Sequence, residues 1–242
     1  MVTQIQVTPF KTATLAIDTA GNFCSVAVLK SEHGRFGADQ ATSFHVESLG
    51  DGDHFEQLPA LLGEVCGKAG IGTRQLTGVV IGTGPGSFTG IRIGMSFAKG
   101  LAWAIRVPLL GYSSFLGCAA AVAQNLPSNV TDIYVVADAR REEVFLGRYK
   151  IEKDRSIAEY VAPRIRPVHE AALIYESGGI VITTQKGFAF GGVHVEAVGT
   201  SALGLLSLAS PSEPFTIEGL GGVHPSYLRA VSARTIAERS GR

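Results

Sequence analysis

The order of predicted strands and helices repeats once along the chain, and this repeat constrains the fold more than any other feature. Each half runs through three extended segments, a helix and a further buried strand. In the first half these are residues 14–20, 24–30, 34–44, 53–70 and 76–83, and in the second half 133–141, 142–152, 158–167, 168–177 and 179–185. Strands mixed with helices in this way indicate α/β lobes. We predict two related α/β lobes, residues 11–125 and 131–236, although the two halves show no similarity in residue identity.

The helix predicted over residues 87–105 is apolar on most of its circumference. The charged residues of the helix are Arg92 and Lys99, and Arg106 follows directly after its last residue. These three residues recur every seven positions and form one narrow stripe. A helix this apolar has to be covered on more than one side, and its own sheet covers one. Small residues four apart leave room for a second helix: Gly90, Gly94 and Ala98. The pattern predicts a surface for another protein, with packing between the two lobes as the alternative.

The stretch "GTGPGSFTGIRIG", residues 82–94, joins a buried strand to this helix, which is where many proteins bind phosphate. It does not match a P-loop, because no Gly-Lys pair follows, nor a dinucleotide-binding loop or a nucleophile elbow, because Thr89 stands where each needs glycine. Ser87 is placed to cap the helix, and the glycines allow a tight turn. A weak contact with a nucleotide phosphate remains the alternative function of Gly84, Gly86 and Ser87.

Asp18, at the end of the first strand in "AIDTAGNFCSVAV", is the candidate for a functional acid. Actin-like ATPases keep a metal-facing carboxylate at this point. The simpler explanation is that the Asp18 side chain caps the turn through nearby backbone amides. Asp138, in "VADARREEVF", occupies the matching point of the second half, and its neighbours from Arg140 to Glu143 read as a solvated turn. The sequence contains no recognisable set of nucleophile, base and orienting group, so we predict no catalytic residues.

Composition excludes several classes of protein. The chain has 21 basic and 21 acidic residues, so the net charge does not favour nucleic acid, and any such contact needs a local patch. The six histidines include no close pair, and the motif that begins at His169 lacks the second histidine of a zinc protease, so no metal site is predicted. The odd number of cysteines, three, in apolar contexts predicts buried, reduced thiols. No apolar run reaches the length of about 18 residues that a membrane span needs, and a cytoplasmic location is expected.

Four segments together resemble the TsaB family of the bacterial threonylcarbamoyladenosine tRNA-modification machinery. They are "LAIDTA…CSVAVL", "GTGPGSFTGIRIGMSFAKGLAWAIRVPLLGYSS", "ADARREEVF" and "PSYLR". The segment "HFEQLPALL" is similar to a helix of that family, without the Arg-Glu pair that usually precedes it, and residues 178–222 show little to align. The resemblance implies an actin-like ATPase (ASKHA) fold of two RNase H-like lobes, the second of them reduced.

The resemblance also implies a non-catalytic scaffold or activator subunit. Such a subunit pairs with a TsaD-type transferase, which modifies N6 of the tRNA adenosine next to the anticodon, and a TsaE-type ATPase docks on the pair. When the chain is alone, the apolar helices of the first lobe predict a homodimer, because an exposed apolar patch finds a partner. We expect tRNA contact only through the complex and no tightly bound cofactor, with ATP or ADP contacted at the interface of the assembled complex. The pairing would use the two first-lobe helices, for which we predict these partner-binding residues: Leu58, Leu61, Leu62, Val65, Ile91, Met95 and Ala98.

Two other functions compete with this one. An active ASKHA-type ATPase or small-molecule kinase would need a second phosphate-binding loop, and "DARREE" lacks the glycines expected there. A metallopeptidase would need clustered histidine and glutamate ligands, which the sequence does not offer. Binding of a nucleotide to the isolated chain, and then to the chain with its paralogue, separates these functions.

Overall fold

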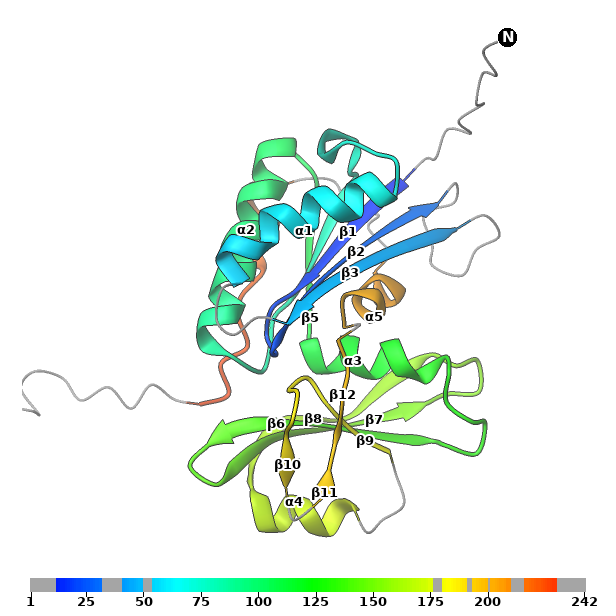
Figure 1. Cartoon of the computed structure of the whole chain (residues 1–242), viewed down its shortest axis with the longest axis vertical. Coiled ribbons are helices and arrows are strands. Elements are labelled where there is room, and N and C mark those ends of the chain that lie inside the picture. The colour runs from blue at the N-terminus through cyan, green and yellow to red at the C-terminus, as the bar shows by residue number, and fades with distance from the viewer. Residues whose placement is uncertain are drawn as a thin grey trace, which may run out of the picture.

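A computed structural model of the chain describes residues 12–31, 41–49, 54–175, 180–190, 193–199, 201–209 and 216–229. The helices and strands form layers in which two five-stranded sheets lie one above the other, with helices between them and on both outer faces (Figure 1). The predicted third strand falls partly on residues outside the described ranges, as does Asp53, the expected cap of the first helix.

The first sheet has the strand order β3-β2-β1-β4-β5. β1, β2 and β3 form an antiparallel meander, and β4 and β5 run parallel to β1. Its strands are β1 Thr12–Asp18, β2 Phe23–Ser31, β3 Thr42–Leu49, β4 Gly78–Gly82 and β5 Leu109–Tyr112. The central strands β1 and β4 are buried almost throughout, as expected for strands covered on both faces.

The second sheet repeats this arrangement, with the order β8-β7-β6-β9-β12. β6, β7 and β8 form the antiparallel meander. β9 pairs in parallel with β6, and β12 pairs in parallel with β9. Its strands are β6 Asp132–Arg140, β7 Glu143–Ile151, β8 Ile157–Pro167, β9 Ile180–Thr183 and β12 Glu196–Ala197, with a separate pair β10 Ala189–Phe190 and β11 Val193–His194. The topological repeat predicted from the sequence is therefore present.

Helices α1 and α2 cover the outer face of the first sheet, and α4 lies on the outer face of the second (Figure 1). Between the sheets, α3 packs on the second sheet and α5 on the first. The helices are α1 His54–Lys68, α2 Phe88–Ile105, α3 Ser114–Ala123, α4 Val168–Tyr175, α5 Ser201–Leu208 and α6 Ile217–Gly222, with a 3₁₀ turn at Thr73–Gln75.

Close packing of α3 against α5 depends on two glycines. A Cβ on Gly204 would lie only 1.8 Å from the carbonyl oxygen of Gly117, so no larger residue fits this crossing. α5 then contributes Ala202, Leu205 and Leu206 to the core of the first sheet. α5 therefore packs with the first sheet, and α6 packs there too, against α2 and β5. The sequence analysis had put both helices in the second lobe. The difference arises because the chain crosses back after β12.

All three cysteines are free and buried, as predicted. Burial raises the pKa of the Cys24 thiol to about 12, and it raises the pKa of Cys66 and of Cys118 as well. These thiols therefore stay protonated and behave as small apolar side chains.

Candidate functional site at the junction of the two sheets

Asp18 ends β1 at the junction between the sheets, and its side chain is only 2% exposed. Its Oδ1 accepts hydrogen bonds from the backbone N–H of Ala20 and from the hydroxyl of Ser114, both at 3.0 Å. Burial raises the pKa of the Asp18 carboxyl, and hydrogen bonds from Ala20, Ser201 and Ser114 only partly oppose that effect. The bond to Ala20 confirms the turn-capping role predicted for Asp18.

The surroundings of Asp18 do not fit a nucleotide-bound metal ion. A Cβ on Gly82 would lie 2.5 Å from Asp18 Oδ1 and 2.6 Å from Ser114 Oγ, so β4 and α3 close directly over the carboxylate. Among the described residues there is no cluster of three or more histidine, cysteine, aspartate or glutamate side chains that could hold a metal ion. A buried carboxyl with a raised pKa is also a poorer cation ligand than a solvated carboxylate.

The glycine loop packs against the turn that follows β1. The N–H of Gly84 donates to Ser114 Oγ at 3.0 Å, and the N–H of Ser87 donates to the carbonyl of Ala20 at 2.7 Å. A Cβ on Gly86, whose φ is 154°, would lie 2.1 Å from that same carbonyl oxygen. The hydroxyl of Ser87 accepts from the N–H of Gly90 at 3.1 Å, which confirms Ser87 as the helix cap. Two of the loop's amide donors are thus used inside the protein.

The turn between β1 and β2 contacts the second sheet. The N–H of Asn22 donates to the carbonyl of Thr184 at 3.0 Å, and a Cβ on Gly21 would lie 2.4 Å from that carbonyl oxygen. The first hairpin therefore lies directly against the residues that follow β9.

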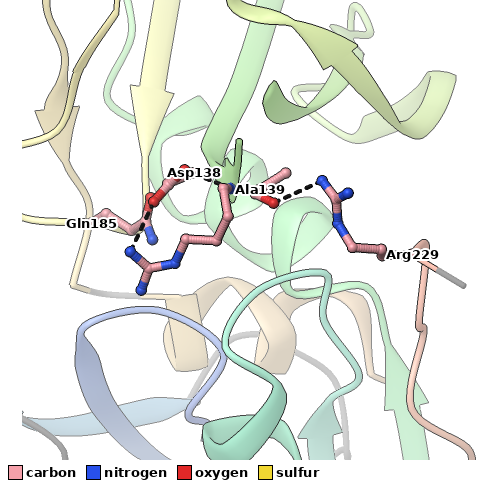
Figure 2. A network of polar contacts seen from close by, with 5 residues as sticks. Asp138, Ala139, Gln185 and Arg229 are labelled. Atoms are coloured by element: carbon pink, nitrogen blue, oxygen red, sulfur yellow. Dashed lines mark hydrogen bonds and ion pairs between the residues drawn. The ribbon is translucent and has the colours of Figure 1, made fainter. Parts of the chain in front are cut away.

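Asp138, the counterpart of Asp18 in the second sheet, belongs to a network of polar contacts (Figure 2). Its backbone N–H donates to Gln185 Oε1 at 2.5 Å, and its carboxylate accepts from the N–H of Arg140 at 2.7 Å. Arg140, Arg141 and Glu142 are exposed, as expected for a solvated turn, and all three have positive φ. Glu143 differs from that prediction, because its carboxylate pairs with Arg229.

The segment 223–229 connects the two sheets, and this connection was not predicted from the sequence. Ser226 N–H donates to the carbonyl of Thr83 at 2.8 Å, next to the glycine loop. Tyr227 packs on Phe88 with ring centroids 5.1 Å apart, and its hydroxyl accepts from Arg92 Nε at 3.0 Å. Two residues later, Arg229 donates to the carbonyl of Ala139 at 2.8 Å, as Figure 2 shows. The quoted motif "PSYLR" thus lies in this connecting strap, residues 223–229.

The residues predicted to bind a partner lie inside the protein, so that choice of side chains is wrong. Each is at most 8% exposed, and all but Ile91 belong to the core that α1 and α2 form with the first sheet: Leu58, Leu61, Leu62, Val65, Ile91, Met95 and Ala98. The helical spacing correctly identified one apolar face on each helix. That face packs on the helix's own sheet, because a single chain already supplies the surface that buries it.

The small residues of α2 also face inward. A Cβ on Gly90 would lie 2.1 Å from the carbonyl oxygen of Thr19, and a Cβ on Gly94 would lie 2.2 Å from Thr19 Oγ1. The Thr19 hydroxyl donates to the carbonyl of Gly90 at 2.7 Å. The row of small residues therefore lets α2 approach the end of β1, where sequence spacing alone had suggested a second helix.

The outward faces of α1 and α2 mix small and apolar residues with charged ones, such as the ion pair between Lys68 and Glu64 on α1 and the exposed Arg92 on α2. On α1, Gly63 and Gly67 are exposed, and a Cβ on either would meet nothing within 4 Å. On α2, Trp103 is 65% exposed, and Ile93 and Phe97 are half-buried at the edge of the core. No helix among the described residues is long and apolar enough to cross a membrane.

Two sheets with the same strand order, packed through a layer of helices, define a two-lobed protein of the actin-like ATPase (ASKHA) class. Two solved structures share this fold, each with 23% identity and each covering 90% of this chain and 100% of its own. One is described as an uncharacterized protein with similarity to peptidase YEAZ from Pseudomonas aeruginosa, with a TM-score of 0.69, and the other as YeaZ from the same organism, with a TM-score of 0.68.

A model of the TsaD family, described as tRNA N6-adenosine threonylcarbamoyltransferase, matches residues 49–208, and the chain therefore belongs to that family. Curated relatives carry the name tRNA threonylcarbamoyladenosine biosynthesis protein TsaB. The relative from Haemophilus influenzae is 30% identical over 142 residues, or 59% of this chain, and the one from Escherichia coli is 30% identical over 140 residues, or 58%. The relative from Bacillus subtilis is 30% identical over 149 residues, or 62% of this chain. The matches span 56% to 59% of those relatives' own length. The resemblance to TsaB stated from the sequence is confirmed.

Proposed function

We propose that this chain is a non-catalytic subunit that pairs with a TsaD-type transferase in threonylcarbamoylation of N6 of the tRNA adenosine next to the anticodon. The names of the TsaB relatives supply the pathway. The observation that carries the non-catalytic role is the burial of Asp18, whose Oδ1 is taken up by Ala20 and Ser114. The carboxylate that could face a metal ion in an active relative serves here to hold β1 against α3.

The loops beside Asp18 support the same proposal. The glycine loop donates to Ser114 and Ala20, and the first hairpin donates to Thr184 across the junction of the sheets. These contacts use backbone groups that an active ATPase of this fold would direct at phosphate. ATP or ADP would then be contacted at the interface with the transferase, and a TsaE-type ATPase would dock on the assembled pair.

We place the transferase on the outward faces of α1 and α2, the α1–α2 surface, made of Ala60, Gly63 and Gly67 with Ile93, Phe97 and Trp103. Gly63 and Gly67 are four residues apart and leave open space above α1, so a partner helix can approach its backbone closely. Trp103, at 65% exposed, is the type of residue that dominates binding energy at interfaces. Without the transferase, the same surface would support a homodimer.

A Gly63→Arg variant tests this placement. The new side chain enters open space, and helix propensity favours arginine over glycine by about 1 kcal/mol or slightly less. We therefore expect α1 to remain folded. We expect the affinity for a purified TsaD-type transferase to fall by about tenfold or more, because a bulky cation blocks the close approach. Gly221→Arg on α6, where a Cβ also meets nothing within 4 Å, is the matched control. Unchanged binding by Gly63→Arg would contradict the placement on α1.

A further inference from the structure

The outer face of the second sheet is only partly covered. Cross-strand pairing puts Tyr134 opposite Arg148, Leu146 opposite Arg164 and Val144 opposite Arg166, so these side chains share one face. Its apolar members pack against Ala171 of α4 and against Val195. The opposite face packs on α3. The charged remainder of the outer face, on β7 and β8, is exposed or half-buried. Helix α4 lies against the same two strands (Figure 1).

Four cations and one exposed tyrosine gather on this remainder, which we call the basic face: Arg148, Lys150, Tyr160, Arg164 and Arg166. Tyr160 is 56% exposed, with Lys150 Nζ 4.2 Å and Arg148 Cζ 4.8 Å from its ring centroid. Cation–π contacts of this kind restrain long side chains that would otherwise move freely. Arg164 and Arg166 stand two residues apart on β8, the edge strand of the sheet, so they lie about 7 Å apart along it.

Carboxylates on this face compensate only part of the positive charge. Arg148 pairs with Asp132 at 2.8 Å, and Arg166 pairs with Glu170 of α4 at 3.8 Å, where both side chains are about half exposed. A pair as exposed as the second is weak and leaves Arg166 able to exchange partners. Within the described residues, no ion pair is formed by Lys150 or Arg164. The face therefore has a positive excess in a chain whose formal net charge is zero.

We propose that the basic face binds the phosphate backbone of the tRNA substrate, an inference that rests on the proposed function. Backbone contacts by arginine, lysine and tyrosine position a protein on nucleic acid without reading its sequence, which suits a subunit that places tRNA for another chain. The exposed ring of Tyr160 also offers a platform for an unpaired base. An acidic polypeptide would also use the cations, but RNA combines phosphates for the cations with unpaired bases that stack on an aromatic ring, so the combination favours RNA. The proposal differs from the expectation that tRNA is contacted only through the complex, and the experiment below decides between the two.

The test compares two double charge reversals in the full chain. R164E/R166E removes two exposed cations of the basic face, and R74E/K186E makes the same change in net charge at exposed positions elsewhere. Binding of an unmodified tRNA transcript is measured at several salt concentrations. We expect R164E/R166E to lose affinity about tenfold and to lower the slope of log affinity against log salt by about 1 to 2, because phosphate contacts release counterions. R74E/K186E should stay within about twofold of the unaltered chain, since distant charges act only through a screened field.

The outcomes separate this inference from the proposed function. Equal losses in the two variants mean that only net charge matters, and no loss in R164E/R166E means that RNA does not use this face; either overturns the inference. Polyglutamate that binds as tightly as tRNA, and is lost in the same variant, would assign the face to an acidic polypeptide instead. Retention of the TsaD-type transferase by R164E/R166E is measured in parallel. If it is retained while RNA affinity is unchanged, the inference fails and the proposed function stands.

Discussion

Ser114 and Asp18, 96 residues apart in the chain, are joined by a hydrogen bond of 3.0 Å from the serine hydroxyl to the carboxylate. The bond ties the start of α3, which lies between the sheets, to the end of β1. The same hydroxyl accepts from the N–H of Gly84, so one serine fixes both the candidate acid and the glycine loop. The two motifs that most suggested catalysis are thereby held together as structure.

The raised pKa of Asp18 predicts how the free energy of unfolding changes with pH. Burial raises the pKa of the Asp18 carboxyl in the folded protein above its pKa in the unfolded chain, so folding favours the protonated form. The stability that depends on protonated Asp18 is fully present below the unfolded-chain pKa and is lost as pH rises through the folded-state pKa. Asp18→Asn removes this dependence. Unfolding free energies of the two proteins, measured from pH 4 to pH 7, should therefore shift in favour of the variant as pH rises. A shift in the opposite direction would mean that the carboxylate is stabilised in its charged form.

Two glycines of α2 should respond in opposite ways to alanine. Gly90→Ala places a methyl group 2.1 Å from the carbonyl oxygen of Thr19, and backbone has to move, so we expect a loss of about 1–3 kcal/mol. Gly100→Ala meets nothing within 4 Å and should gain about 0.5–1 kcal/mol from helix propensity. Denaturant unfolding of both variants checks the pair. Equal effects would contradict the close approach of α2 to β1.

Two charge substitutions on α2 distinguish its buried and exposed faces. Met95→Asp puts an unpaired carboxylate into the core of the first sheet and should lower the free energy of unfolding by about 3 kcal/mol or more. Trp103→Asp, at a position 65% exposed, should leave the fold nearly as stable and weaken binding of the transferase. Thermal unfolding and a pull-down of each variant provide the measurements. A stable, folded Met95→Asp protein would show that this face is accessible after all.

The connecting strap should depend on Arg229. Arg229→Ala removes donors to the carbonyl of Ala139 and to Glu143, and we expect a loss of about 1 kcal/mol after solvent screening. Hydrogen exchange at the N–H of Ser226 should become faster, because the strap loses its attachment to the second sheet. Arg140→Ala, which removes a mostly exposed pair with Asp138, is the control and should leave that exchange unchanged. Equal exchange in both variants would contradict the role of Arg229.

The repeat of strands and helices was predictable because hydrophobic spacing records which face of each element is buried. The same spacing does not say what covers that face. Leu61 and Met95 were correctly recognised as members of apolar faces but wrongly assigned to a partner, since their own sheet covers them. The cap at Ser87 was predictable because it involves neighbours in sequence. The bonds from Ser114 to Asp18 and from Arg92 to Tyr227 of the connecting strap join distant segments, and no local pattern reveals such contacts.

The basic face escaped prediction for a related reason. Arg148 and Lys150 on β7 and Arg164 on β8 each look like ordinary alternating surface residues of a strand. They form one patch only after the register of β7 with β8 is known, including the irregularity between Leu146 and Tyr149. Net charge hid the patch further, because the rest of the chain balances it.

Reconstitution with a TsaD-type transferase tests the central claim, that this chain assists the reaction without taking a chemical part in it. With threonylcarbamoyl adenylate supplied as the donor, whose leaving group is AMP, formation of N6-threonylcarbamoyladenosine in a tRNA transcript would be measured with the transferase alone, with this chain alone, and with both. We predict product only with both chains, and undiminished product when Asp18→Asn replaces the unaltered chain at saturating concentration. Product formed by this chain alone, or loss of product in the Asp18→Asn complex while the two chains still bind each other, would contradict the claim.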